Sequence, residues 1–344
     1  MKLFMFKGKK ILITGGTGSL GQALTKRLLK DEVDTIRIFS RNEHRQISME
    51  SKFRDDRLRF FIGDVRDYER LTRALENIDI VFHAAALKHV PIVEYNPFEA
   101  IKTNVIGSQN VINACLQEDV EKAVCVGTDK AVSPLNTYGA TKLLMEKLFV
   151  TASNYLNKKR HKTKFIALRY GNVLGSSGSV VPKFIKQIND SRTITITDPN
   201  MTRFSITMDQ ALNFILESAD IGQGSEIFVP KLRAYSIIIV KDAIMELVGK
   251  AKEEIVGVRP GEKLHETLIN QDELRYTCEI NDKYVIFQSL DHLNEKKKFY
   301  TEIKKTSLSK TYSSDSVDKI SKEEFKKIIT ENVLLDRGKE STSE

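Results

Sequence analysis

The sequence predicts an α/β fold in which a doubly wound parallel sheet carries a smaller C-terminal lobe. Three observations favour this fold. Apolar runs of strand length alternate with segments of helical period, the runs are apolar on both faces, and a glycine-rich turn joins the first run to the first helix. The chain has 344 residues, of which 41% are hydrophobic and 29% are charged. This length and composition fit one large folded domain or two small ones.

The elements of the sheet follow in order from the N-terminus. Residues 10–14 form an apolar run that ends in glycines, and from Gly18 onward apolar residues repeat at helical spacing. A helix is also expected over residues 100–116. Further strands are expected over residues 35–40, 59–63, 80–85 and 123–128. Strands that alternate with helices predict parallel pairing, with helices on both faces of the sheet.

The alternation of strands and helices loosens after Arg169. A loop rich in Gly and Ser spans residues 171–178, a helix is expected over 181–189, and a turn over 199–201. These changes indicate a second, smaller lobe.

We expect the chain to divide into a sheet domain, a smaller lobe and a tail. The sheet domain takes residues 1–172, with 203–230 returning to it, and the lobe takes 173–202 and 231–287. The tail, residues 288–344, turns polar and holds 12 Lys and Arg with 11 Asp and Glu from residue 291 onward. This composition predicts a weakly packed tail with one helix near 322–329.

Positive charge is concentrated near the N-terminus. The chain has 54 Lys and Arg against 46 Asp and Glu, a net charge of +8, and residues 1–60 alone hold 14 and 7 of them. The cations alternate with acids and lack interleaved aromatic residues, which favours a solvated surface over a nucleic-acid interface. A bound anionic cofactor could use a few of these cations.

The sequence lacks the patterns of a membrane span, a disulfide framework and a metal site. No run approaches the roughly 18 consecutive apolar residues of a span, and Lys7, Lys9 and Lys10 interrupt the opening apolar segment. We therefore expect a cytoplasmic protein without membrane insertion. The three cysteines have no paired spacing, and the six histidines form no ligand pattern, so neither disulfides nor a metal site are predicted.

The turn after the first strand has the composition of a phosphate-binding loop. Its glycines stand between the strand and the helix, where they permit a tight turn. Backbone N–H groups and the helix N-terminus can then meet a pyrophosphate directly. We predict a Rossmann-type dinucleotide site made by Gly15, Thr17, Gly18, Ser19, Leu20 and Gly21.

The end of the second strand indicates which dinucleotide binds. Proteins that bind NAD usually offer an acid there to the ribose hydroxyls. Here Ser40 is followed by Arg41 and, four residues on, by Arg45. Guanidinium groups suit a 2′-phosphate, so the sequence predicts NADP rather than NAD.

Two further segments are expected to contact the cofactor. Asp64 and Val65 follow the third strand and could contact the adenine. Ala84, Ala85 and Ala86 follow the fourth strand. These alanines either leave room for the cofactor against the backbone or allow close helix packing.

Tyr138 and Lys142 are spaced by four on a predicted helix, so both project from one face. A nearby ammonium lowers the pKa of the phenol, and the phenolate can take a proton from a sugar hydroxyl while hydride leaves for nicotinamide. We therefore predict that Tyr138 and Lys142 both contact the cofactor and both take part in catalysis.

Thr128, Asp129 and Lys130 follow the strand at 123–128, at the edge where the sites of such sheets open. Thr128 can hydrogen-bond the same substrate oxygen as Tyr138. Asp129 and Lys130 could supply an acid and a base, a pair that simple alcohol oxidation does not require. The alternative for this pair is a salt-bridged loop.

Together these motifs resemble the extended short-chain dehydrogenase/reductase family. Within it, the chain is similar to the UDP-N-acetylglucosamine 4,6-dehydratases of pseudaminic acid biosynthesis that invert C5. The resemblance spans roughly residues 7–287. It rests on residues 15–21, 83–91, 96–97, 128–131, 138–142, 169–172, 201–204 and 259–266.

The resemblance implies a lyase that removes water from UDP-N-acetylglucosamine with NADP as a recycled cofactor. Tyr138 would take the C4 hydroxyl proton as hydride leaves C4, Lys130 would remove the C5 proton, and Asp129 would protonate the departing C6 hydroxyl. Hydride would return to C6, and C5 would be reprotonated on the opposite face. The product would be UDP-2-acetamido-2,6-dideoxy-β-L-arabino-hex-4-ulose.

The resemblance also implies the substrate contacts and self-association. Lys88, Lys130, Asn172, Arg203 and Arg259 match positions that face the UDP-sugar, although either arginine could instead form a structural ion pair. The roles of Glu262 and His265 stay open. The alternative activities are a nucleotide-sugar 4-epimerase and a dehydratase that retains C5, and a scaffold that binds nucleic acid is the alternative outside enzymes.

Overall fold

The computed structural model describes residues 4–332 except 155, 158 and 177. Ser177 of the Gly- and Ser-rich loop and residues 333–344 of the predicted tail therefore lie outside the described residues. Within the described part, no helix is both long and apolar enough to cross a membrane.

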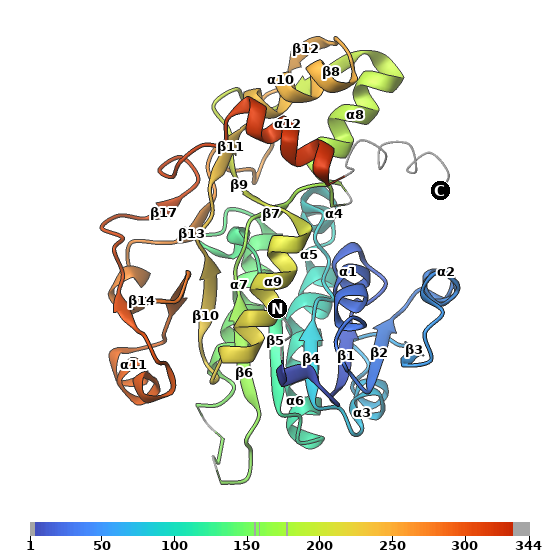
Figure 1. Ribbon diagram of the computed structural model, residues 1–344, viewed down its shortest axis with the longest axis vertical. Helices are drawn as coiled ribbons and strands as arrows, with labels where there is room; N and C mark the ends of the chain where they lie inside the picture. Colours follow the sequence, from blue (N-terminus) through green and yellow to red (C-terminus); the bar gives the residue numbers. More distant parts are fainter. Residues whose placement is uncertain (1–3, 155, 158, 177, 333–344) are drawn as a thin grey trace.

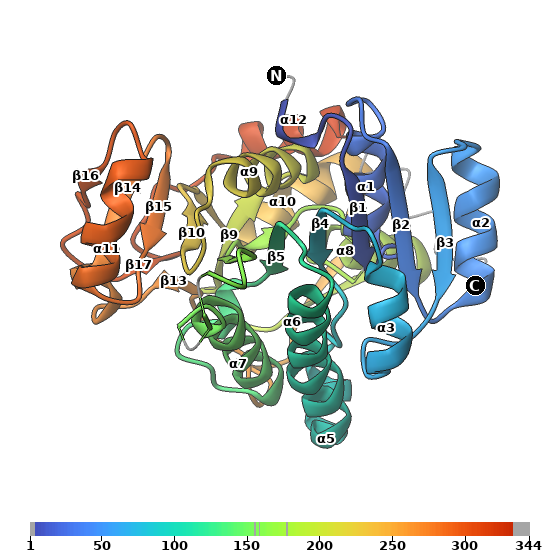
Figure 2. The same cartoon turned by 90° about the horizontal axis from the view of Figure 1, so that it is seen from below.

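Ten strands of the described chain form one sheet, in the order β16-β14-β15-β10-β6-β5-β4-β1-β2-β3 (Figure 1 and, for β15 and β16, Figure 2). From β3 to β10 in this order the strands run parallel, and β15, β14 and β16 continue the sheet in antiparallel pairing. The order reverses between β1 and β4, where a doubly wound sheet opens a crevice for a ligand. The bounds are β1 Lys10–Thr14, β2 Thr35–Ser40, β3 Leu58–Ile62, β4 Ile80–His83, β5 Lys122–Val126, β6 Lys164–Leu168, β10 Ile227–Pro230, β14 Thr277–Ile280, β15 Lys283–Ile286 and β16 Lys304–Lys305.

Helices cover both faces of this sheet (Figure 2). Helices α1 and α9 pack their apolar residues on one face, and α3, α6 and α7 pack on the other. The bounds are α1 Ser19–Leu28, α2 Glu43–Phe53, α3 Tyr68–Leu75, α4 Val90–Tyr95, α5 Pro97–Ala100, α6 Gly107–Gln117, α7 Thr137–Thr151 and α9 Met208–Ile221. The predicted doubly wound α/β fold is confirmed.

A smaller group of elements lies at one end of the molecule, beyond the carboxyl ends of the parallel strands (Figure 1). Its helices share a separate apolar cluster that includes Phe184, Ile244 and Phe325. The bounds are α8 Val180–Ser191, α10 Ile237–Val248, α12 Lys322–Glu331, β7 Asn172–Val173, β8 Thr193–Ile196, β9 Thr202–Ile206, β11 Ala234–Ser236, β12 Lys252–Ile255, β13 Thr267–Ile269 and β17 Tyr312–Ser313. The short helix α11, Leu290–Lys296, lies beside β14 instead.

Two expectations about local structure need correction. The expected helix over 100–116 is interrupted, because a π-helical segment, Ile101–Ile106, separates α5 from α6. The tail is not weakly packed: Tyr300, Tyr312, Phe325 and Ile329 are buried, and α12 packs against α10. Polar composition misled the prediction, because a few apolar residues at suitable spacing suffice to dock a short helix.

Candidate active site

A cavity of about 640 Å³ opens at the carboxyl ends of the parallel strands, above the reversal between β1 and β4. Most of the predicted site residues line this cavity, although they come from separate parts of the chain. They are Gly15, Thr17, Gly18, Ser19, Leu20, Gly21, Ser40, Arg41, Arg45, Asp64, Val65, Ala84, Ala85, Ala86, Lys88, Thr128, Lys130, Tyr138, Lys142 and Asn172. Asp129 is fully buried beside Lys130, and neither Arg203 nor Arg259 belongs to the lining.

The glycine turn forms a cradle that a dinucleotide phosphate fits. Gly15 has φ +67°, and a Cβ there would lie 2.9 Å from the backbone of Ala85. The alanines after β4 therefore pack directly against the turn. Gly18 caps α1 without any side-chain hydrogen bond, so the first backbone N–H groups of the helix face the cavity with no side chain capping them.

Polar and charged side chains at the ends of β2 and β3 form hydrogen bonds and ion pairs. The Ser40 hydroxyl accepts a hydrogen bond from Gln46 Nε2 at 3.0 Å. Asp64 lies 2.7 Å from Arg66 and 3.6 Å from Arg41. Burial acts against ionisation of Asp64, but the hydrogen bonds from Arg66 and the charge of Arg41 hold its pKa below the ordinary value.

Asn104, in the π-helical segment, fixes the loop that follows β4. Its side chain accepts a hydrogen bond from Leu87 N at 2.8 Å and donates to Leu87 O at 3.0 Å. It also donates to the Thr141 hydroxyl of α7 at 3.0 Å. One buried amide thus ties the loop that carries Lys88 to the helix that carries Tyr138, and nothing in the motifs pointed to it.

The start of α7 is held against the loop at 128–131. Asn136 caps the helix by accepting a hydrogen bond from Gly139 N at 2.7 Å. A Cβ at position 139 would lie 2.3 Å from Lys130 O, so the glycine permits the close approach of the two segments. This approach places Tyr138 next to Thr128 and Lys130 in the cavity wall.

Tyr138, Lys142 and Glu146 follow one another at intervals of four along α7. Glu146 forms a buried bidentate ion pair with Arg169, with both N–O distances at 2.6 Å. Arg169 also binds Glu273 at 2.8 and 2.9 Å. Leaving either charge of such a buried pair without its partner costs free energy. The network of Glu146, Arg169 and Glu273 therefore fixes the rotation of α7 about its axis.

Tyr138 is buried, and burial raises the pKa of its phenol. The charge of Lys130 and a hydrogen bond with Thr128 act in the opposite direction. We expected Lys142 to be the cation that lowers this pKa. In the structure the charge of Lys130 has this effect, and Lys142 Nζ donates to Val126 O at 2.7 Å, so the role of Lys142 stays a prediction.

Lys130 lies between two carboxylates. Its Nζ is 3.0 Å from Asp129 Oδ1 and 3.2 Å from Glu266 Oε1, and it donates to Asn172 Oδ1 at 3.1 Å. Burial favours the neutral amine, but the two carboxylates raise the pKa of Lys130 above its ordinary value. Burial raises the pKa of Asp129, and Lys130 only partly offsets this.

Glu266 is the charged group that the sequence analysis missed. Its side chain is buried, and burial opposes its ionisation, but Lys130 and Arg203 hold its pKa below the ordinary value. Glu266 is the last residue of the motif at 259–266, so the sequence alone showed that it belongs to a motif. Its contact with Lys130 was not, because it forms only when the small lobe folds over the sheet.

The remaining predicted residues support the cavity from outside. Arg203 donates to the backbone carbonyls of Thr202, Lys263 and Leu264 at 2.8–2.9 Å. His265 Nδ1 is 2.8 Å from the Thr202 hydroxyl. Lys263, on the same loop, donates to Val132 O at 2.6 Å and so ties the loop to the segment after Lys130. Among the residues that the structure describes, no cluster of His, Cys, Asp or Glu could hold a metal ion.

Residues 11–288 match the sequence model of a family described as polysaccharide biosynthesis protein. The chain belongs to this family. The match covers the cavity and all of the sheet except β16 and the first residue of β1, and it confirms the resemblance inferred from the motifs.

Relatives with different names are similar to the chain. A UDP-N-acetylglucosamine 4,6-dehydratase (inverting) from Campylobacter jejuni is 47% identical over 86% of this chain and 87% of its own length. A UDP-glucose 4-epimerase from Rickettsia felis is 39% identical over 94% of this chain and 96% of its own length.

Among solved structures, Pen from Bacillus thuringiensis is 40% identical and has a TM-score of 0.89, covering 96% of this chain and 99% of that chain. The dTDP-glucose 4,6-dehydratase DesIV from Streptomyces venezuelae is 21% identical with a TM-score of 0.70, covering 85% and 96%. At that identity the second likeness concerns the fold alone.

Proposed function

We propose that this protein is a UDP-N-acetylglucosamine 4,6-dehydratase that inverts C5, a carbon–oxygen lyase. The observation that carries the proposal is the pair Asp129–Lys130 beside Tyr138 at the cavity. Oxidation of an alcohol needs only one proton acceptor, whereas elimination of water needs an acid and a base in addition. The Campylobacter jejuni relative, whose printed name is this activity, supports the same conclusion.

The residues at the cavity can perform the proton transfers in sequence. Tyr138 takes the proton of the C4 hydroxyl, with Thr128 hydrogen-bonded to the same oxygen. Once hydride has also left C4, the resulting ketone acidifies C5–H. Lys130 removes that proton as the neutral amine, after its own proton has passed to Asp129, whose Oδ1 is 3.0 Å away. Asp129, whose pKa is raised by burial, gives its proton to the C6 hydroxyl, which leaves as water.

Reprotonation of C5 on the face opposite Lys130 would give UDP-2-acetamido-2,6-dideoxy-β-L-arabino-hex-4-ulose. The support for inversion is the similarity to the Campylobacter jejuni relative rather than a contact in the cavity.

We propose NADP as the cofactor, which supplies hydride chemistry by accepting hydride from C4 and returning it to C6. Gly15, Gly18 and the first turn of α1 would hold the pyrophosphate. Arg41 and Arg45 would hold the 2′-phosphate at the end of β2, where an acid would favour NAD. Lys142 would contact the nicotinamide ribose.

For the UDP-sugar, we propose contacts from Lys88, Asn172, Arg203 and Arg259 in addition to Lys130. Lys88 and Asn172 line the cavity, whereas Arg203 and Arg259 lie outside it. For Arg259 to reach the pyrophosphate, the loop at 259–266 would have to move toward the cavity. Arg203 lies on β9 and would have to release the carbonyls of Lys263 and Leu264.

We further propose that the protein acts in the cytoplasm, in the supply of pseudaminic acid for surface glycans, and that it self-associates. All three cysteines are buried free thiols, which suits a reducing compartment. We propose no nucleic-acid partner.

A 4-epimerase acting on a nucleotide sugar is the second candidate, because relatives with that printed name cover almost the whole chain. An epimerase would leave Asp129 and Lys130 without a chemical task. Incubation of the purified protein with UDP-N-acetylglucosamine, followed by mass spectrometry, separates the two. A product that has lost one water supports the dehydratase, and an isomer of unchanged mass contradicts it.

A further inference from the structure

The segment after residue 288 reaches the active site through Ser314, although its polar composition gave no sign of this. Ser314 is fully buried. Its hydroxyl accepts a hydrogen bond from Glu266 N at 2.9 Å, and its own N–H donates to Glu266 O at 2.8 Å. The same hydroxyl lies 2.8 Å from the Thr202 hydroxyl. Ser314, which lies far along the chain, therefore holds both the backbone N–H and the backbone carbonyl of Glu266.

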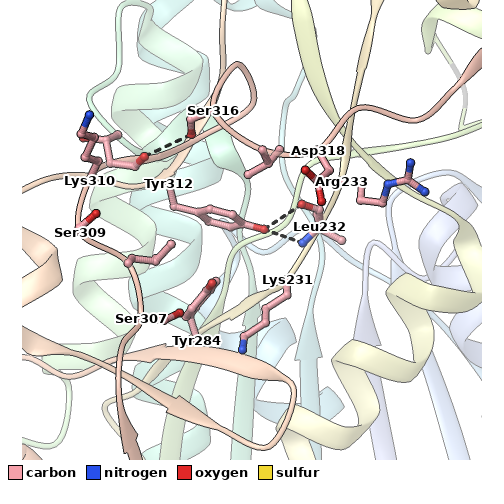
Figure 3. Close-up of a pocket in the computed structure, with 13 residues that line it drawn as sticks. Lys231, Leu232, Arg233, Tyr284, Ser307, Ser309, Lys310, Tyr312, Ser316 and Asp318 are labelled. Carbon is pink, nitrogen blue, oxygen red and sulfur yellow. Dashed lines mark hydrogen bonds between the residues drawn. The ribbon is translucent and has the colours of Figure 1, made fainter.

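The segment is itself anchored two residues earlier, at Tyr312 (Figure 3). The Tyr312 hydroxyl accepts a hydrogen bond from Leu232 N at 2.5 Å and donates to Leu232 O at 3.0 Å. Its ring is buried and packs on Phe204 and Tyr284. Tyr312 in β17, which pairs with β13, and Ser314 directly after this strand thus fasten the segment to two different parts of the protein.

Glu266 in turn has contacts that a purely structural residue would not need. Its Oε1 lies 3.2 Å from Lys130 Nζ and 3.8 Å from Arg203 Nε. Its Oε2 is buried and has no hydrogen-bond partner among the described residues, and the same is true of Asp129 Oδ2. Two buried carboxylates that share one ammonium, each with one oxygen unsatisfied, are costly to the fold and are typical of a functional site.

We propose that Glu266 is a positioning residue for the dehydration, holding Lys130 at Asp129, and that the C-terminal segment positions Glu266 through Ser314. This inference rests on the proposed function for its catalytic meaning. Glu266 does not contact the reacting atoms; it acts through Lys130.

The charge of Glu266 also affects the protonation of both partners. Its negative charge raises the pKa of Asp129 and that of Lys130. In the proposed mechanism this favours the protonated form of Asp129, which the leaving hydroxyl needs. The other charged or titratable groups that face this cluster are Tyr138 on α7, Arg203 on β9, Tyr235 on β11 and Lys263 on the loop before β13.

The main test is Glu266→Gln, which keeps the shape and removes the charge. We expect kcat to fall by about 10²-fold, the loss typical of a misplaced catalytic group, with a much smaller change in KM. The pH at which activity declines on the alkaline side should move to lower pH.

In Ser314→Ala, kcat should also fall, by a smaller factor than in Glu266→Gln. Wild-type kcat and an unshifted pH profile in Glu266→Gln would overturn the proposal, and unchanged kcat in Ser314→Ala would overturn the part that concerns the C-terminal segment.

Two matched variants control for damage to the fold. Glu226→Gln alters a fully buried glutamate that binds Tyr300 at 2.9 Å, away from the cavity. Ser218→Ala alters a fully buried serine on α9. Both should keep the wild-type kcat and pH profile, whatever their effect on Tm. A shifted pH profile in Glu226→Gln would contradict a specific role for Glu266.

A second measurement needs no substrate. NMR of protein labelled at lysine Cε, with the Lys130 signal assigned from Lys130→Met, reports the pKa of Lys130 directly. Glu266→Gln should lower it, and an unchanged value would overturn the proposal. Because this titration is independent of turnover, it distinguishes failure of this inference from failure of the proposed function, which would show as a wild-type protein that releases no dehydrated product.

Discussion

In the proposed mechanism the first step depends on Tyr138, whose phenol is buried next to Lys130 and Thr128. Tyr138→Phe removes the oxygen that accepts the C4 proton. We expect kcat to fall by about 10²–10⁴-fold, the usual contribution of a general base. Steady-state turnover of UDP-N-acetylglucosamine checks this, with Tyr276→Phe, at a half-buried position outside the cavity lining, as the control. A Tyr138→Phe variant that keeps more than a tenth of the wild-type kcat would contradict the role.

Lys130 separates dehydration from simple oxidation. In Lys130→Ala the base for C5–H is lost while Tyr138 remains, so we expect no dehydrated product, although oxidation at C4 can still begin. Mass spectrometry of the sugar nucleotide and the absorbance of the reduced cofactor report the two steps separately. Full dehydratase activity in Lys130→Ala would contradict the assignment of Lys130 as the base for C5–H.

Residues that act through local motifs were predictable, and residues that act through long-range contacts were not. The glycine turn and the pair Tyr138 and Lys142 each lie within a few positions of one another, so spacing alone revealed them. Glu266 and Asn104 reach the site only because separate segments meet in three dimensions. For the same reason, the sequence could not show that the charge of Lys130 lowers the pKa of Tyr138.

At the scale of elements, the contact between α7 and the loop at 128–131 depends on the absence of a side chain at position 139. In Gly139→Ala the new Cβ would meet Lys130 O at 2.3 Å. We expect a loss of about 1–3 kcal/mol in the free energy of unfolding, as for other overpacked sites, and a lower kcat because Tyr138 shifts. Denaturant unfolding and turnover check this, with the exposed neighbour variant Ala140→Ser as the control. A Gly139→Ala protein as stable and as active as the wild type would contradict the close approach.

His83 joins three elements: β4, which carries it, β1 through Thr14 at 2.8 Å, and α6 through Ser108 at 2.9 Å. Burial, with the charge of Lys142, lowers its pKa from 6.5 to about 3. Below pH 6.5 the unfolded chain binds a proton here and the folded protein does not, so this contribution to stability is complete above 6.5 and is lost as the pH falls toward 3.

His83→Gln removes this titration. The difference in the free energy of unfolding between wild type and variant should shrink by about 1.4 kcal/mol per pH unit below pH 6.5. Urea unfolding at several pH values measures it. Stability curves of wild type and variant that run parallel between pH 6 and 4 would show that His83 is not held neutral.

The doubly wound parallel arrangement of the sheet followed from the alternation of strands and helices, but the interruption at Ile101–Ile106 did not. The apolar period of a π-helical segment differs from that of an α-helix over only a few residues, which is too short a stretch to detect. The packing of α12 on α10 was also missed, because two buried residues, Phe325 and Ile329, do the docking in a segment that is otherwise charged.

At the scale of the whole molecule, large apolar side chains are exposed along α4 and α5. Ile92 is 60% exposed, Tyr95 86% and Phe98 61%. Such a patch favours association with a second copy of the chain. Sedimentation velocity should give a species heavier than the 39.1 kDa monomer, and Phe98→Asp should shift it toward the monomer. The control is Phe299→Asp, because Phe299 is 53% exposed elsewhere. A wild-type protein that sediments as a monomer would contradict the proposal.

The measurement that tests the central claim most directly is NMR of the purified protein with UDP-N-acetylglucosamine in D₂O, without added NADP. We predict a 6-deoxy-4-keto product that carries deuterium at C5 and has L-arabino couplings, formed with the cofactor that the protein retains. A D-xylo product would contradict the inversion. Formation of UDP-N-acetylgalactosamine instead would mean a 4-epimerase and would contradict the dehydratase itself.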